Sequence, residues 1–170
     1  MTFKSMRHTL QELESSGRLV RFLPDMDRDE SEKRRLLMTP AISQFLKGNY
    51  PRKVKIDYYA RIRARLGHYV KGFSIEDNDD FFKQLHPYGQ ERLKDFWEIR
   101  ITFDPHSRIF GAFAAKDCFV AMRAKFRDDC GKEFSRGFKR AISACESDWN
   151  SLFGSLPRFR CFPLPNCISV

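Results

Sequence analysis

The chain lacks the signatures of several common protein classes. No uninterrupted apolar stretch is long enough to cross a bilayer, and the first residues, MTFKSMRHTLQELE, lack the apolar core of a signal peptide. The five cysteines are odd in number and show neither CxxC spacing nor companion histidines at zinc-ligand intervals. No phosphate-binding glycine loop, dinucleotide fingerprint or serine nucleophile motif is present. We therefore expect a cytoplasmic protein with no membrane partner, reduced and mostly buried thiols, no metal and no small-molecule cofactor.

What the chain does have is positive charge. Its 170 residues include 31 Lys and Arg against 22 Asp and Glu, a formal net charge of +9. Such an excess favours a polyanionic partner such as nucleic acid, although a merely soluble basic protein would show it too. The length fits one compact domain with a sizeable core, to which 17 phenylalanines contribute.

The stretch from Phe96 to Arg127 predicts a small antiparallel sheet with a basic face. Its first run alternates Trp97, Ile99, Ile101 and Phe103 with Glu98, Arg100 and Thr102, which is typical of a strand with one buried face. Asp104-Pro105-His106-Ser107 has turn chemistry, a second strand follows over residues 108–113, and a third over 118–126. Simple alternation in the third strand places Arg123 and Lys125 on the side of Phe119 and Ala121. We expect a three-stranded meander, one face of which meets a ligand.

Helices are predicted on both sides of this sheet in the sequence. Thr39-Pro40 is a good helix start for residues 41–46, and residues 55–71 carry apolar side chains at three- and four-residue spacing before Gly72. Residues 132–153 form a third helical pattern with a broad apolar face. Upstream, a short helix over 9–14 and a strand over 18–23 could form an accessory layer.

Three segments carry a resemblance to a known family. They are Leu93–Arg100 (LKDFWEIR), Ser107–Phe110 (SRIF) and the hydrophobic run Val120–Phe126, which ends in Phe. With the upstream pieces AISQFLKG and KIDYYARIRARLGHY, they resemble the RelE/HigB superfamily of toxin-antitoxin ribonucleases and their phage-derived relatives. The first is similar to the family's L-K-x-x-L-W-E-L-R passage, the second to its Y-R-I-F strand, and the upstream pieces to its two N-terminal helices. The resemblance spans roughly residues 36 to 150.

The resemblance implies an α+β fold, with N-terminal helices packed on a small antiparallel, mixed-edge β-sheet and a C-terminal helix. It divides the chain into an N-terminal extension (1–35), a RelE-like domain (36–153) and a C-terminal tail (154–170). It also implies metal-independent cleavage of messenger RNA, in which the ribose 2′-hydroxyl attacks the adjacent phosphate on a translating ribosome. A protein antitoxin is the implied second partner.

The same resemblance points to particular residues. Arginine suits the phosphate because its planar fork stays charged and can hold two oxygens. Arg108 takes the position of the family's second-strand arginine, and basic residues recur at the end of the third strand. His106 is a candidate acid or base because imidazole titrates near neutral pH. The candidate catalytic residues are Arg108, Arg127 and His106, and the candidate RNA-binding residues are Arg100, Arg123 and Lys125.

The chain also departs from the family pattern. Asp128 and Asp129 stand where many relatives have two lysines, and a carboxylate pair there would repel RNA; the same residues could instead cap a following helix. Phe134 and Phe138 occupy the region of a tyrosine often found near the C-terminal helix. The alternative interpretation is therefore a catalytically inactive RelE-fold protein with a nucleic-acid-binding or regulatory function.

Overall fold

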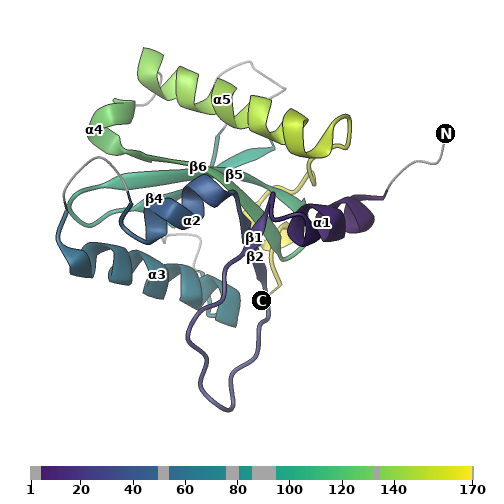
Figure 1. Ribbon diagram of the computed structural model, residues 1–170, viewed down its shortest axis with the longest axis horizontal. Helices are drawn as coiled ribbons and strands as arrows, with labels where there is room; N and C mark the ends of the chain where they lie inside the picture. Colours follow the sequence, from purple (N-terminus) through teal and green to yellow (C-terminus); the bar gives the residue numbers. More distant parts are fainter. Residues whose placement is uncertain (1–4, 50–53, 76–80, 86–94, 132–134, 170) are drawn as a thin grey trace.

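The computed structural model describes residues 5–49, 54–75, 81–85, 95–131 and 135–169 (Figure 1). Within these ranges the chain forms five α-helices and a six-stranded sheet. The helices are α1 (Met6–Ser15), α2 (Pro40–Leu46), α3 (Ile56–Lys71), α4 (Arg127–Cys130) and α5 (Arg136–Phe153), with a 3-10 turn, η2 (Leu164–Asn166). The strands are β1 (Val20–Arg21), β2 (Arg35–Met38), β3 (Phe82–Gln84), β4 (Phe96–Ile101), β5 (Ser107–Ala115) and β6 (Cys118–Phe126).

The sheet is open and mostly antiparallel, with the strand order β1-β2-β6-β5-β4-β3. The predicted meander is confirmed, because β4 pairs with β5 and β5 with β6, both antiparallel. Only β2 and β6 run parallel among the described strands. The α+β class and the mixed sheet are thus as predicted, while β3 lies in a stretch for which no strand was predicted.

Helices cover both faces of the sheet, with α2 and α3 on one side and α5 on the other (Figure 1). The alternation in β4 explains how one strand serves both layers: Trp97 and Ile99 join the core under α2 and α3, whereas Phe96 joins the core under α5. The expectation of a ligand-facing sheet side is corrected here. The apolar stripe of α5, which includes Phe138, Ile142, Cys145 and Trp149, buries that side instead.

A β-bulge in β6 decides where its basic residues point. Gly111 pairs with Ala121 but Phe110 pairs with Arg123, so Met122 is an extra residue on β6. Simple alternation placed Arg123 on the side of Ala121; the inserted residue moves it to the α5 side, where it pairs with Asp148 of that helix. A Cβ on Gly111 would collide with the carbonyl oxygen of Val120, which explains the need for glycine beside the bulge.

Helix ends follow the predicted signals, with one change of partner. Gly72 ends α3 in a left-handed conformation (φ 81°), and Pro40 opens α2 after Thr39. The Thr39 hydroxyl, however, donates to the carbonyl oxygen of Met122 at 2.9 Å rather than capping α2. The predicted helix over 132–153 begins at Arg136 in the described part of the chain, and residues 132–134 lie outside it.

The terminal segments pack on the same two cores. Leu10 and Leu13 of α1 are buried in the core under α5, and β1 forms a short antiparallel ladder with β2. At the other end, the buried guanidinium of Arg34 donates to the carbonyl oxygen of Ser169 at 2.6 Å and to that of Phe73 at 2.9 Å. It thereby ties the C-terminal tail to the end of α3.

The prediction of reduced thiols is wrong for two of the five cysteines. Cys161 and Cys167 form a disulfide in the tail, whereas Cys118, Cys130 and Cys145 are buried free thiols. Sequence spacing alone did not reveal that the tail turns back on itself through η2. Burial raises the pKa of Cys118 to about 11, so this thiol stays protonated and unreactive near neutral pH.

Candidate nucleic-acid interface

Arg108, the first catalytic candidate, lies in a buried ion pair. One of its terminal nitrogens, Nη1, contacts both carboxylate oxygens of Glu98, at 2.5 and 2.6 Å. Glu98 is fully buried and Arg108 is 6% exposed, with its guanidinium 5.4 Å from the ring centre of Phe138 in α5. A guanidinium held in this way carries little net charge toward solvent. Sequence reasoning missed Glu98 as its partner. The usable signal was that Glu98 and Arg108, which carry opposite charges, lie on two strands predicted to be neighbours.

Further cations surround this pair because four neighbouring strands contribute to one end of the sheet. The register places Arg108 opposite Arg100 on one side and Lys125 on the other, and Lys83 opposite Glu98. The Arg100 Nε lies 3.7 Å from a Glu98 oxygen. Burial raises the pKa of Glu98, against the attraction of Arg108, Arg100 and Lys83, which lowers it. The single carboxylate of Glu98 therefore lies among several cations, and this group of side chains keeps a net positive charge.

His106 and Arg127 meet at the exposed end of this row. The Arg127 backbone N–H donates to the His106 carbonyl oxygen at 2.8 Å, which extends the β5–β6 ladder by one pair. Their side chains are also close, with Arg127 Nη1 at 3.5 Å from His106 Nδ1, and both residues are exposed. These two side chains are therefore accessible to a large substrate, which Arg108 is not.

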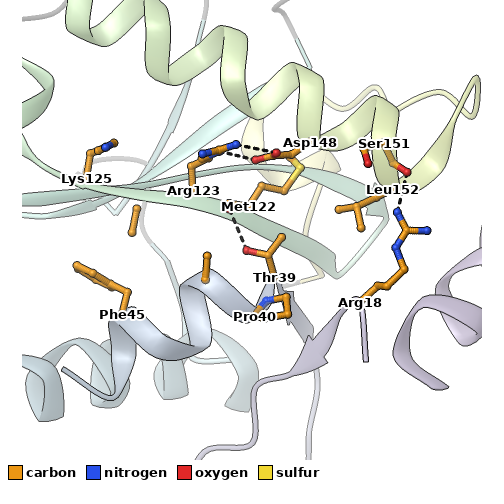
Figure 2. A pocket seen from close by; sticks show the side chains of 12 residues that line it. Arg18, Thr39, Pro40, Phe45, Met122, Arg123, Lys125, Asp148, Ser151 and Leu152 are labelled. Carbon is orange, nitrogen blue, oxygen red and sulfur yellow. Dashed lines mark hydrogen bonds and ion pairs between the residues drawn. The ribbon is translucent and has the colours of Figure 1, made fainter. Parts of the chain in front are cut away.

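Arg123 and Lys125 line a cleft of about 510 Å³ beside this end of the sheet (Figure 2). The cleft runs along β6 between α2 and α5. Arg123 is held by two hydrogen bonds to Asp148, 2.5 Å from Nε and 2.8 Å from Nη2, and the bond to this carboxylate raises the pKa of Arg123. The Arg18 guanidinium, which sequence reasoning did not select, enters the cleft from the N-terminal segment and donates to the Ser151 carbonyl oxygen at 2.8 Å.

Five of the six predicted residues thus form one group, and the sixth lies at its margin. Strand pairing joins Arg100, Arg108 and Lys125, and His106 with Arg127 continues the same β5–β6 ladder. Arg123 is turned toward α5. The two carboxylates that broke the family pattern, Asp128 and Asp129, are exposed in the first turn of α4, where they face the positive end of the helix backbone.

No protein-family model, curated protein or solved structure matches this chain. Among the described residues, no helix has both the length and the apolar character needed to span a membrane. In the same residues no group of three His, Cys, Asp or Glu side chains is placed to hold a metal ion.

Proposed function

We propose that the chain is a RelE/HigB-like toxin that binds and cleaves RNA at the basic end of its sheet. The observation that carries this proposal is the convergence of Arg100 and Lys125, on either side of the buried Arg108, next to the exposed pair His106 and Arg127. Backbone phosphates are the natural ligand for such a row. The order of helices and strands and the mixed sheet support the resemblance seen in the sequence.

The chemistry assigned to this site needs no metal. Arg127 holds the oxygens of the scissile phosphate, and His106 accepts the proton of the ribose 2′-hydroxyl as that oxygen attacks phosphorus. The P–O5′ bond breaks, the proton passes to the leaving 5′-oxygen, and a 2′,3′-cyclic phosphate is left on the upstream fragment. Lys125 and Arg100 bind the flanking phosphates. Arg108, which Glu98 neutralises, acts as a positioning residue that fixes β4 against β5 beneath them.

A second candidate function is RNA binding without cleavage. The observation that favours it is the burial of Arg108, because the sequence assigned the central catalytic role to a side chain that contacts Glu98 and Phe138 rather than solvent. In either case the basic surface suits an acidic protein partner, which corresponds to the antitoxin of the resembled family.

The two functions are separated by one set of variants. The wild-type chain, His106→Ala, Arg127→Ala and the control Lys47→Ala, an exposed residue at the end of α2, are expressed under induction and assayed for cleavage of mRNA on translating ribosomes. We expect growth arrest and cleavage for wild type and control. Each site variant should lose about 100-fold or more in cleavage rate, the usual size of an acid-base contribution.

RNA affinity, measured in parallel on a non-cleavable 2′-deoxy oligonucleotide, distinguishes the outcomes. Soluble wild-type protein that binds RNA but neither cleaves it nor arrests growth would support the binding function and contradict the enzymatic one. Absence of both binding and cleavage would contradict the whole proposal.

A further inference from the structure

The outer edge of β6 changes neighbours halfway along the strand. Its first half pairs with β2, but that ladder ends at Met38 and Ala121. Thr39 then binds the next two outward carbonyls: its N–H donates to Ala121 O at 3.0 Å and its hydroxyl to Met122 O at 2.9 Å. Beyond Thr39 the chain turns into α2 and leaves the line that β2 followed (Figure 2).

The next residue with outward backbone groups is Ala124. In an antiparallel ladder, hydrogen-bonded and non-hydrogen-bonded pairs alternate. The bond from Arg127 N–H to His106 O identifies 106/127 as a bonded pair, so 108/125 and 110/123 are bonded and 109/124 is not. The N–H and C=O of Ala124 therefore point away from β5, into the cleft that this residue lines. Among the described residues, no backbone bond outside the strand ladders reaches Ala124.

The walls of the cleft suit alternating side chains. Ala41 and Phe45 line it from α2, and Met122 and Leu152 line it from the α5 side. A strand in the line of β2 would direct successive side chains toward these two walls in turn. Five residues of β6, 122–126, span about 17 Å of edge at about 3.3 Å per residue.

The charged side chains that line the cleft indicate which kind of ligand it binds. Arg18 stands toward one end and Lys125 toward the other, with Arg123 between them (Figure 2). The single acidic side chain among the lining residues, Asp148, is engaged by Arg123. A backbone edge between apolar walls favours a peptide over a nucleic acid, since a nucleic acid offers no ladder of alternating donors and acceptors. Three cations against one carboxylate favour an acidic peptide.

We propose that this cleft binds an acidic, extended segment of a protein partner, which adds a strand to the open half of β6. The inference rests on the proposed function only for the expectation of a protein partner, and it does not depend on RNA cleavage. Because Lys125 belongs both to the cleft and to the RNA-binding row, the bound segment excludes RNA from that end of the sheet.

The test uses a panel of fluorescein-labelled nonapeptides that alternate Glu with Val, Leu or Phe, titrated into the full chain. Binding of at least one is expected, with amide hydrogen exchange at Ala124 slowed about 10-fold or more at saturation. The matched peptide in which central backbone amides are N-methylated should bind at least about 10-fold more weakly, because it loses ladder donors while the protein is unchanged. Lys-for-Glu peptides should not bind.

Protein variants then locate the site. Arg18→Glu and Lys125→Glu should each weaken peptide binding about 10-fold, whereas Lys139→Glu, the same charge change on an exposed position of α5, should not. Equal effects of all three would show diffuse charge attraction and overturn the proposal. It would also be overturned if no peptide bound, or if a nine-residue oligouridine and not the peptides protected Ala124. Failure of RNA cleavage with peptide binding intact would contradict the proposed function alone.

Discussion

Removing the charge of Arg108 should destabilise the fold strongly, and removing its partner as well should restore most of the loss. Arg108→Met keeps an unbranched, apolar stem but removes the guanidinium, and it leaves the carboxylate of Glu98, which has no exposed surface, without its closest cation. Arg108→Met/Glu98→Leu replaces the pair by apolar groups. Glu98→Gln alone removes the buried negative charge and keeps an oxygen that can accept from Arg108.

The magnitudes follow from the geometry of the pair. Two unit charges about 4 Å apart attract by roughly 4 kcal/mol at an effective dielectric of about 20, while burial costs each ion several kcal/mol. The pair as a whole therefore contributes little net free energy to folding. One charge left without its partner, however, keeps its desolvation cost. We expect Arg108→Met to lower the free energy of unfolding by about 3 kcal/mol at pH 7, the lower end of the range for a broken buried pair, because Arg100 remains 3.7 Å from Glu98. The double variant should fall within about 1 kcal/mol of wild type.

Urea unfolding, followed by the fluorescence of the buried Trp97 and Trp149 and by circular dichroism, measures these differences. Asp25→Asn, an exposed acidic residue, is the control and should change stability by no more than about 0.5 kcal/mol. If Arg108→Met were as stable as wild type but abolished RNA cleavage, Arg108 would be a catalytic residue rather than a positioning one. If the double variant were as unstable as the single one, the packing of the arginine stem, not its charge, would hold the strands together.

Three further outcomes are expected from the same structure. Burial raises the folded-state pKa of Glu98 above the usual 4.5, so this residue stabilises the fold below pH 4.5 and loses that contribution as the pH rises through the raised pKa. Urea midpoints measured from pH 4 to 8 should therefore show that the stability of wild type relative to Glu98→Gln falls with rising pH. A rise would contradict the prediction. Gly111→Ala should cost about 1–3 kcal/mol because its methyl group meets the carbonyl oxygen of Val120, and an unchanged melting temperature would refute the need for glycine at the bulge. Ser135→Ala removes the hydroxyl that accepts the Phe138 N–H at 3.2 Å at the start of α5 and donates to the Cys130 carbonyl oxygen at 2.9 Å; it should cost about 1 kcal/mol, whereas Ser135→Thr, which keeps the hydroxyl, should restore most of the loss.

Local patterns in the chain predicted most of the elements. Alternation in Trp97, Glu98 and Ile99 indicated a strand because side chains of an extended chain point to opposite faces in turn, and the spacing in residues 55–71 indicated a helix for the corresponding reason. The Asp104-Pro105 turn and Gly72 were readable from backbone restrictions of single residues. The parallel pairing of β2 with β6 was not readable in this way, because it joins segments separated by more than 70 positions.

The candidate site was predicted as a set of residue types but not as an arrangement. His106, Arg108 and Lys125 were selected as one basic group, and strand register brings them to one end of the sheet. Arg18 and Asp148 were missed because their role depends on which distant backbone or side chain they meet, and nothing in their local sequence specifies that contact.

The sequence by itself determined the charge of this protein, the positions of most of its helices and of the meander β4-β5-β6, and the resemblance that suggests a ribonuclease toxin. Only the tertiary structure decided which basic residues remain available to a ligand. A single inserted residue at Met122 reverses the direction of the side chains that follow it, and α5 buries the side of the sheet that carries Arg108. Both decisions depend on pairing and packing between distant segments: Arg108 is neutralised by Glu98 across a strand, while Arg127 and His106 stay exposed at the end of the same ladder.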